Sequence, residues 1–174
     1  KKTHVDVSGG EAAEALAAAR QDTELSLGEI ARLIVSDGVG ELAPETLLLA
    51  LNAPAELARN ADRVMVGVHA FDRNQPFIII ETRYYDLAFG AMLSWEEKMA
   101  KTLGAFYEPV LARTLPPDLH FTDIVYRNID VRKSESEWPI LYAFPEEKLL
   151  VITTNLNTLQ EILTVKSDYV AGRV

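Results

Sequence analysis

The chain has 174 residues, of which 48% are hydrophobic and 25% are charged, a composition typical of one globular domain. It contains no cysteine, which excludes disulfides, thiolate catalysis and cysteine-based zinc or iron–sulfur sites. Acidic residues outnumber basic residues 26 to 17, and the net charge of −9 disfavours binding to a nucleic-acid backbone.

The N-terminal third of the chain is predicted to be mainly helical. Residues 1–9 are polar, and we expect a disordered segment there. Residues 10–60 are expected to form a helical part that packs on the core, beginning with a helix over 10–21, where helix propensity is high. Residues 26–29 (SLGE) form a capping-box pattern. That pattern predicts a short helix whose apolar residues are Ile30, Leu33 and Ile34.

Two further short helices are predicted before residue 61. Pro44 suits the first turn of a helix, and Leu47, Leu48 and Leu51 would form its buried side. Pro54 restarts the chain into a second short helix that ends near Asn60.

The predicted sheet follows, with about five strands identified by alternation of apolar residues and by turn residues between them. The run 77–80 is continuously apolar, which favours a central strand covered on both faces. A one-residue slip or bulge is expected near Asn128. The expected strands are 64–71, 77–82, 124–133, 140–144 and 148–154.

Two helices are predicted within and after the strand-rich region. Asp86 is a suitable N-cap for a long amphipathic helix over 87–107, where apolar residues recur every three or four positions. Asn155 or Asn157 is expected to cap a final helix. Residues 166–174 are expected to be a tail.

These elements predict an α+β fold with a core over 61–165. We expect a mostly antiparallel sheet of about five strands with the long amphipathic helix on one face.

Two parts of this core resemble each other. In 68–93 and 141–163, His69-Ala70-Phe71 matches Tyr142-Ala143-Phe144, and the apolar run 77–80 matches 149–152. The similarity predicts two repeated hairpin–helix units that superpose. The alternative is coincidence, because short apolar strings in strand–turn–strand–helix units match easily.

Few residues indicate catalysis. None of the three histidines has a partner at metal-ligand spacing, and no phosphate-binding loop or nucleophilic serine motif is present, so we expect no cofactor and no metal. The most enzyme-like cluster is Trp95-Glu96-Glu97, because a carboxylate beside an indole can gain a raised pKa and act as a general acid. Adjacent residues face different directions on a helix, so a solvated acidic face is the alternative interpretation.

Aromatic residues offer a second kind of candidate site. Tyr84, Tyr85, Tyr126 and Trp138 are candidates for partner binding, since amphipathic aromatics give a large contact area with a polar handle. Trp138 is the best single candidate, because it lies at the entrance to a strand. The alternative is that these side chains complete the core.

A family resemblance is carried by 89–96 (FGAMLSWE), by 149–155 and by 159–163. With these motifs the chain, over about residues 44–163, resembles uncharacterised bacterial membrane-anchored proteins that have one N-terminal transmembrane segment and a soluble extracytoplasmic α+β domain. The resemblance implies an extracytoplasmic domain and gives no catalytic residue. The chain begins at Lys1 without methionine, and we expect it to be a piece of a longer protein that carries the anchor.

The expected function is therefore a non-catalytic binding or scaffolding module with a protein or cell-envelope partner and no nucleic acid. Contact with the membrane is expected only through the anchor, and a cytoplasmic location stays open. The alternative is a small acid–base enzyme, a hydrolase or transferase, that uses Glu96 or Glu97. An enzyme would hold one of these carboxylates in a concave pocket with a second polar group converging on it, whereas a binding module would leave both on an open helix face.

Overall fold

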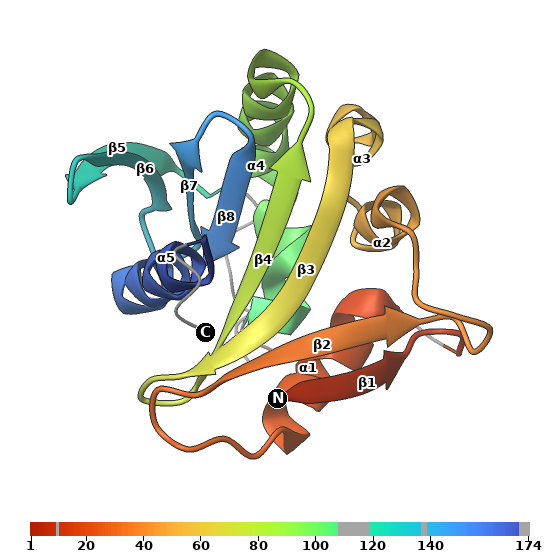
Figure 1. Cartoon of the computed structure of the whole chain (residues 1–174). Helices are drawn as coiled ribbons and strands as arrows, with labels where there is room; N and C mark the ends of the chain where they lie inside the picture. The colour runs from red at the N-terminus through yellow and green to blue at the C-terminus, as the bar shows by residue number, and fades with distance from the viewer. Residues whose placement is uncertain (10, 108–118, 137–138, 171–174) are drawn as a thin grey trace.

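A computed structural model of the protein describes residues 1–9, 11–107, 119–136 and 139–170, with side chains to residue 166. It is an α+β fold in which a twisted sheet has helices on both faces (Figure 1). The strands are β1 (Lys2–Asp6), β2 (Ile30–Ser36), β3 (Ala61–Ala70), β4 (Asn74–Thr82), β5 (Phe121–Tyr126), β6 (Ile129–Ser134), β7 (Leu141–Glu146) and β8 (Leu149–Thr153). The helices are α1 (Ala12–Asp22), α2 (Pro44–Ala50), α3 (Ala55–Asn60), α4 (Tyr85–Tyr107) and α5 (Leu156–Val170).

All the described strands belong to one eight-stranded sheet with the order β1-β2-β3-β4-β8-β7-β6-β5. The pair β1–β2 is parallel and the other neighbours are antiparallel, so the sheet is mixed and larger than the five strands predicted. The central pair joins β4 to β8, with Ile78 opposite Ile152 and Ile80 opposite Leu150. This pair connects the N-terminal and C-terminal halves of the molecule.

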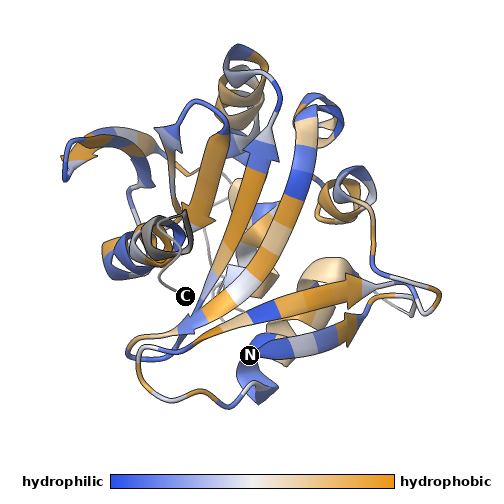
Figure 2. Ribbon diagram, viewed as in Figure 1, coloured by the Kyte–Doolittle hydropathy of each residue, from blue (hydrophilic) through white to orange (hydrophobic). Residues whose placement is uncertain are grey.

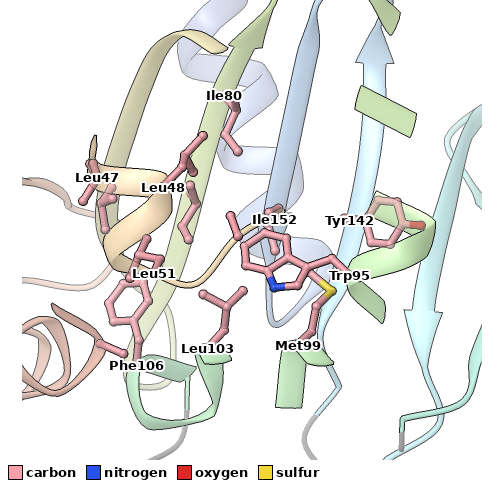
Figure 3. Packing of buried hydrophobic residues seen from close by; sticks show 14 of the residues in the cluster. Leu47, Leu48, Leu51, Ile80, Trp95, Met99, Leu103, Phe106, Tyr142 and Ile152 are labelled. Carbon is pink, nitrogen blue, oxygen red and sulfur yellow. The ribbon is translucent and has the colours of Figure 1, made fainter. Parts of the chain in front are cut away.

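Both faces of the central strands are buried, as the continuous apolar run 77–80 predicted. On one face, Trp95 and Met99 of α4 pack with Ile80 and Ile152 of the sheet (Figure 3). On the other face, Leu159 and Ile162 of α5 pack in a second cluster with Phe77 and Val151. Figure 2 shows β4 and β8 as nearly continuous hydrophobic stretches, the pattern of strands covered on both sides.

The prediction that two hairpin–helix units superpose is wrong. Two copies of one hairpin–helix unit in a shared sheet would place the helix on the same face of each hairpin. Instead, α4 and α5 cover opposite faces (Figure 1). His69 and Tyr142, which the sequence similarity aligned, also contact different helices: His69 bonds Thr158 of α5, and Tyr142 bonds Glu96 of α4.

The N-terminal third differs most from prediction. Residues 2–6, predicted to be disordered, form β1, and the predicted helix after the capping-box pattern is the strand β2. Ala31, Leu33 and Val35 of β2 are buried in alternation, a period-2 pattern, whereas the prediction followed Ile30, Leu33 and Ile34 at helical spacing.

The capping-box contact itself is present, since the Ser26 N–H donates to the Glu29 carboxylate at 2.8 Å. It closes a turn that leads into a strand, because the residues that follow bury alternate side chains against the sheet.

The predicted long strand 124–133 is a hairpin. Arg127 and Asn128 both have positive φ, 50° and 66°, and connect β5 to β6 as a two-residue turn. Turns with two such residues match the twist of antiparallel strands. The chain therefore reverses direction near Asn128, and the predicted slip or bulge at this position is wrong.

The predictions for α2, α3 and α4 are confirmed to within a few residues. Leu47, Leu48 and Leu51 are buried under α2, as predicted. Residue Asp86 lies inside the first turn of α4, because the helix begins at Tyr85. Helix α5 extends through Val170, into the segment predicted as a tail.

Candidate functional site

The structure places the predicted aromatic site residues in different surroundings. Trp138 lies outside the described residues. Tyr84 is exposed where β4 leads into α4, and its backbone is bonded to the Asn60 side chain. Tyr126 packs against the cluster on the α5 face, with the Arg127 guanidinium 5.7 Å from its ring centre. Of the predicted aromatic residues that the structure describes, Tyr85 is the one that lines a hollow on the α4 face.

That hollow, the aromatic groove, lies between the start of α4 and the outer strands of the sheet. Its volume is about 520 Å³. Strands β5, β6 and β7 form its floor, which α4 leaves uncovered. Its lining includes Tyr85, Phe89, Asp123, Asp130, Arg132, Tyr142 and Phe144.

Three rings form one wall of the groove. Tyr85 stacks on Phe89 with ring centres 5.7 Å apart, and Phe144 meets Tyr85 edge to face at 5.1 Å and Phe89 at 6.1 Å. Tyr85 and Phe89 are one helical turn apart, so α4 presents both on one side. Mutual contacts of this kind stabilise the rings in fixed positions.

Arg132 lies at the floor of the groove and is held by carboxylates. Its Nε and Nη2 atoms both donate to Glu96 at 2.8 Å, and Nη1 donates to Asp123 at 3.2 Å. The Tyr142 hydroxyl donates to the same Glu96 carboxylate at 2.6 Å. Figure 3 shows the Tyr142 ring beside Trp95, with its hydroxyl directed away from the hydrophobic cluster.

The Glu96, Arg132 and Tyr142 side chains of this network are largely shielded from water, whereas Asp123 is exposed. The Glu96 side chain is 13% exposed and that of Arg132 is 21% exposed. Hydrogen bonds to Glu96 raise the pKa of the Arg132 guanidinium further above its ordinary value. Burial, and secondly the hydrogen bond to Glu96, raise the pKa of the Tyr142 phenol well above 10. Arg132 therefore stays charged and Tyr142 stays protonated at neutral pH.

Glu96 and Glu97 have different roles. Glu97 is on the exposed face of α4, whereas Glu96 accepts hydrogen bonds on both carboxylate oxygens. Polar groups thus converge on Glu96, which was the feature expected of an enzyme. Arg132 and Tyr142 donate three hydrogen bonds to this carboxylate, two of them to Oε1, so Glu96 orients these two side chains.

A hollow of about 560 Å³ beside β1 and α1 is lined mainly by alanines and by charged residues of both signs, and it is more open than the aromatic groove. In the described part of the chain, no three His, Asp or Glu side chains are placed to hold a metal ion. The aromatic groove is therefore the better candidate for specific contacts.

Comparison with known proteins gave no family model, no curated protein and no solved structure that matches this chain. No helix among the described residues combines the length and the apolar character needed to cross a bilayer.

Proposed function

We propose that this protein is a non-catalytic binding module whose aromatic groove receives side chains of a protein or cell-envelope partner. The observation that carries the proposal is the wall formed by Tyr85, Phe89 and Phe144 beside the fixed Arg132 guanidinium. Tyr85 is 39% exposed, so part of its ring is available for contact.

The geometry favours binding for a physical reason. Rings that already contact one another lose little conformational freedom when a ligand packs on them, and Arg132 is held by Glu96 and Asp123 before any ligand arrives. Preorganised contacts of this kind lower the entropic cost of association. Aromatic residues and arginine are also enriched among the residues that dominate interface energies.

The proposed location is outside the cytoplasmic membrane, on a longer protein anchored by a transmembrane segment. It is supported by the resemblance of residues 44–163 to membrane-anchored bacterial proteins. Examination of the N-terminus of the full-length gene product tests this part: a transmembrane segment before Lys1 supports it, and a start codon shortly before Lys1 contradicts it.

The second candidate function is an acid–base enzyme that uses Glu96, and the convergence of Arg132 and Tyr142 on this carboxylate favours it. It is the weaker candidate, because a general base must lie within hydrogen-bond reach of the reacting proton. The Glu96 side chain is 13% exposed and is not among the residues that line the groove. Turnover in a panel of ester, amide and glycoside substrates that disappears in Glu96→Gln while the fold is retained would reverse this order.

Selection of random peptides displayed on phage tests the binding proposal. We expect the wild-type protein to enrich peptides whose binding is lost in Tyr85→Ala. Tyr84→Ala is the matched control, because Tyr84 is the neighbouring tyrosine, is 65% exposed and does not line the groove. Circular dichroism must show that both variants are folded. Equal loss in the two variants, or no enriched peptide, would contradict the proposal.

A further inference from the structure

We infer that the aromatic groove recognises a cationic side chain, lysine or arginine, of its polypeptide partner. This inference rests on the proposed binding function and specifies the chemistry of the ligand. It is derived from the balance of charge in the groove and from the position of the aromatic wall.

The groove carries more negative than positive charge. Two carboxylates, Asp123 and Asp130, line the groove with one guanidinium, Arg132, and the Glu96 carboxylate bound to Arg132 brings the local net charge to −2. Glu96 does not line the groove, and it accepts hydrogen bonds from Arg132 and Tyr142 from the α4 side of the sheet.

Asp123 and Asp130 are the carboxylates that a ligand can reach. The Asp123 side chain is 78% exposed and contacts Arg132 through one oxygen at 3.2 Å, which leaves its other oxygen open. Asp130 is exposed and forms no ion pair with any residue that the structure describes. A cation that enters the groove therefore gains two accessible partners, while Arg132 is already neutralised by Glu96.

The aromatic wall strengthens the same preference. A lysine or arginine head can lie over an exposed ring face while its aliphatic stem packs on apolar carbon. Tyr85 and Phe144 provide such carbon on the side of the groove where α4 approaches β7. The whole chain carries a net charge of −9, which further attracts a basic segment at long range.

The test uses three small probes of similar length: Nα-acetyl-lysine amide, Nα-acetyl-norleucine amide and Nα-acetyl-glutamate amide. Each is titrated into ¹⁵N-labelled protein, and amide chemical shifts are followed by NMR. We expect the lysine probe to shift the amides of Asp130, Arg132 and Phe144 more strongly than the other two. Added NaCl should weaken its binding, because the rim carboxylates are exposed.

Variants identify the groups responsible. Asp130→Asn should weaken binding of the lysine probe about two- to fivefold, the size expected for one exposed charge pair. Glu97→Gln, which removes an exposed carboxylate of α4 that does not line the groove, should leave binding unchanged. Both substitutions are at exposed positions and are expected to fold.

Three results would overturn the inference. If the norleucine probe shifts the groove amides as strongly as the lysine probe, the groove prefers apolar ligands. If the glutamate probe binds more tightly, Arg132 makes the groove an anion site. If no probe shifts these amides, the groove has no charge preference that single residues can report. In all three cases the peptide selection with Tyr85→Ala still decides the proposed binding function independently.

Discussion

The ring of Phe77 lies on Gly67, the residue directly opposite it on the neighbouring strand. A Cβ atom on Gly67 would be 2.3 Å from the ring carbon Cζ of Phe77 and 2.6 Å from the Ala31 carbonyl oxygen. The glycine thus gives the Phe77 ring its position on the α5 face of the sheet. Phe77 is 1% exposed, so the contact is part of the core.

Gly67→Ala should lower the free energy of unfolding by about 1–3 kcal/mol, the usual cost of overpacking a core. The clash with Ala31 involves backbone of β2, which can move only with the sheet. Gly90→Ala is the control, because nothing lies within 4 Å of its would-be Cβ and it lies inside α4. That variant should gain about 0.5–1 kcal/mol. Denaturant unfolding followed by circular dichroism measures both, and a shift in the same direction would contradict the explanation.

Glu96→Gln should destabilise the fold by about 1.5–3 kcal/mol, because it weakens charge-assisted hydrogen bonds to a shielded Arg132. Glu97→Gln, one residue further along α4 and exposed, should change stability by less than about 0.5 kcal/mol. A double-mutant cycle with Arg132→Met measures the coupling between Glu96 and Arg132. Additive effects in that cycle would show that the pair is not coupled.

His69 should make stability depend on pH. It is 3% exposed, its Nδ1 lies 3.0 Å from the Thr158 hydroxyl, and burial lowers its pKa below 6.5, partly offset by Glu161. Just below pH 6.5, His69 is protonated in the unfolded chain but remains neutral in the folded protein. The free energy of unfolding therefore falls as pH drops through 6.5 towards the lower folded pKa.

His69→Asn removes this titration, so its unfolding free energy should fall less than that of the wild type between about pH 7.5 and pH 5. His120→Asn is the control, because His120 is exposed. Urea unfolding at several pH values gives both slopes. A wild-type slope in His69→Asn would show that other groups cause the dependence.

Asn155→Ala should cost about 1 kcal/mol, since the Asn155 side chain accepts the Thr158 N–H at 2.8 Å and caps α5. The sequence left Asn155 and Asn157 as alternative caps. Asn157 lies inside the helix and is exposed, so Asn157→Ala should be neutral or slightly stabilising. Thermal unfolding compares the stability of the two variants directly. A larger loss of stability in Asn157→Ala than in Asn155→Ala would contradict the assignment of the cap to Asn155.

Sequence patterns predicted the elements whose burial follows a single period. The apolar run 77–80 and the helix with Trp95 and Met99 were identified because both are strongly patterned and lie at the centre of the core. The apolar residues of segment 30–36 fit both a helical and a strand period, and pairing with the sheet favours the strand. Strand β1 is short, polar and at the edge, so it has little pattern of its own and depends on pairing with β2.

The candidate site was predicted in part. Tyr85 and Glu96 were named from sequence, but Phe89, Phe144 and Arg132 were not named as site residues. They come from α4, β7 and β6, and the sheet order brings these elements together. An amphipathic pattern explained Phe89 fully, so nothing local marked it as a groove residue. The sequence around Arg132 does not indicate that its partner is Glu96, which lies on a helix 36 residues away in the chain.

The central strand pairing has a consequence for synthesis of the chain. Ile78 and Ile80 of β4 emerge from the ribosome long before their partners Ile152 and Leu150 of β8. Until then β4 is an apolar strand with an open edge, the kind of surface that pairs with other nascent chains. Any truncation before β8 would make this state permanent. We therefore expect fragments that end before residue 149 to aggregate. We also expect the yield of folded intact chain to depend on the time between synthesis of β4 and synthesis of β8.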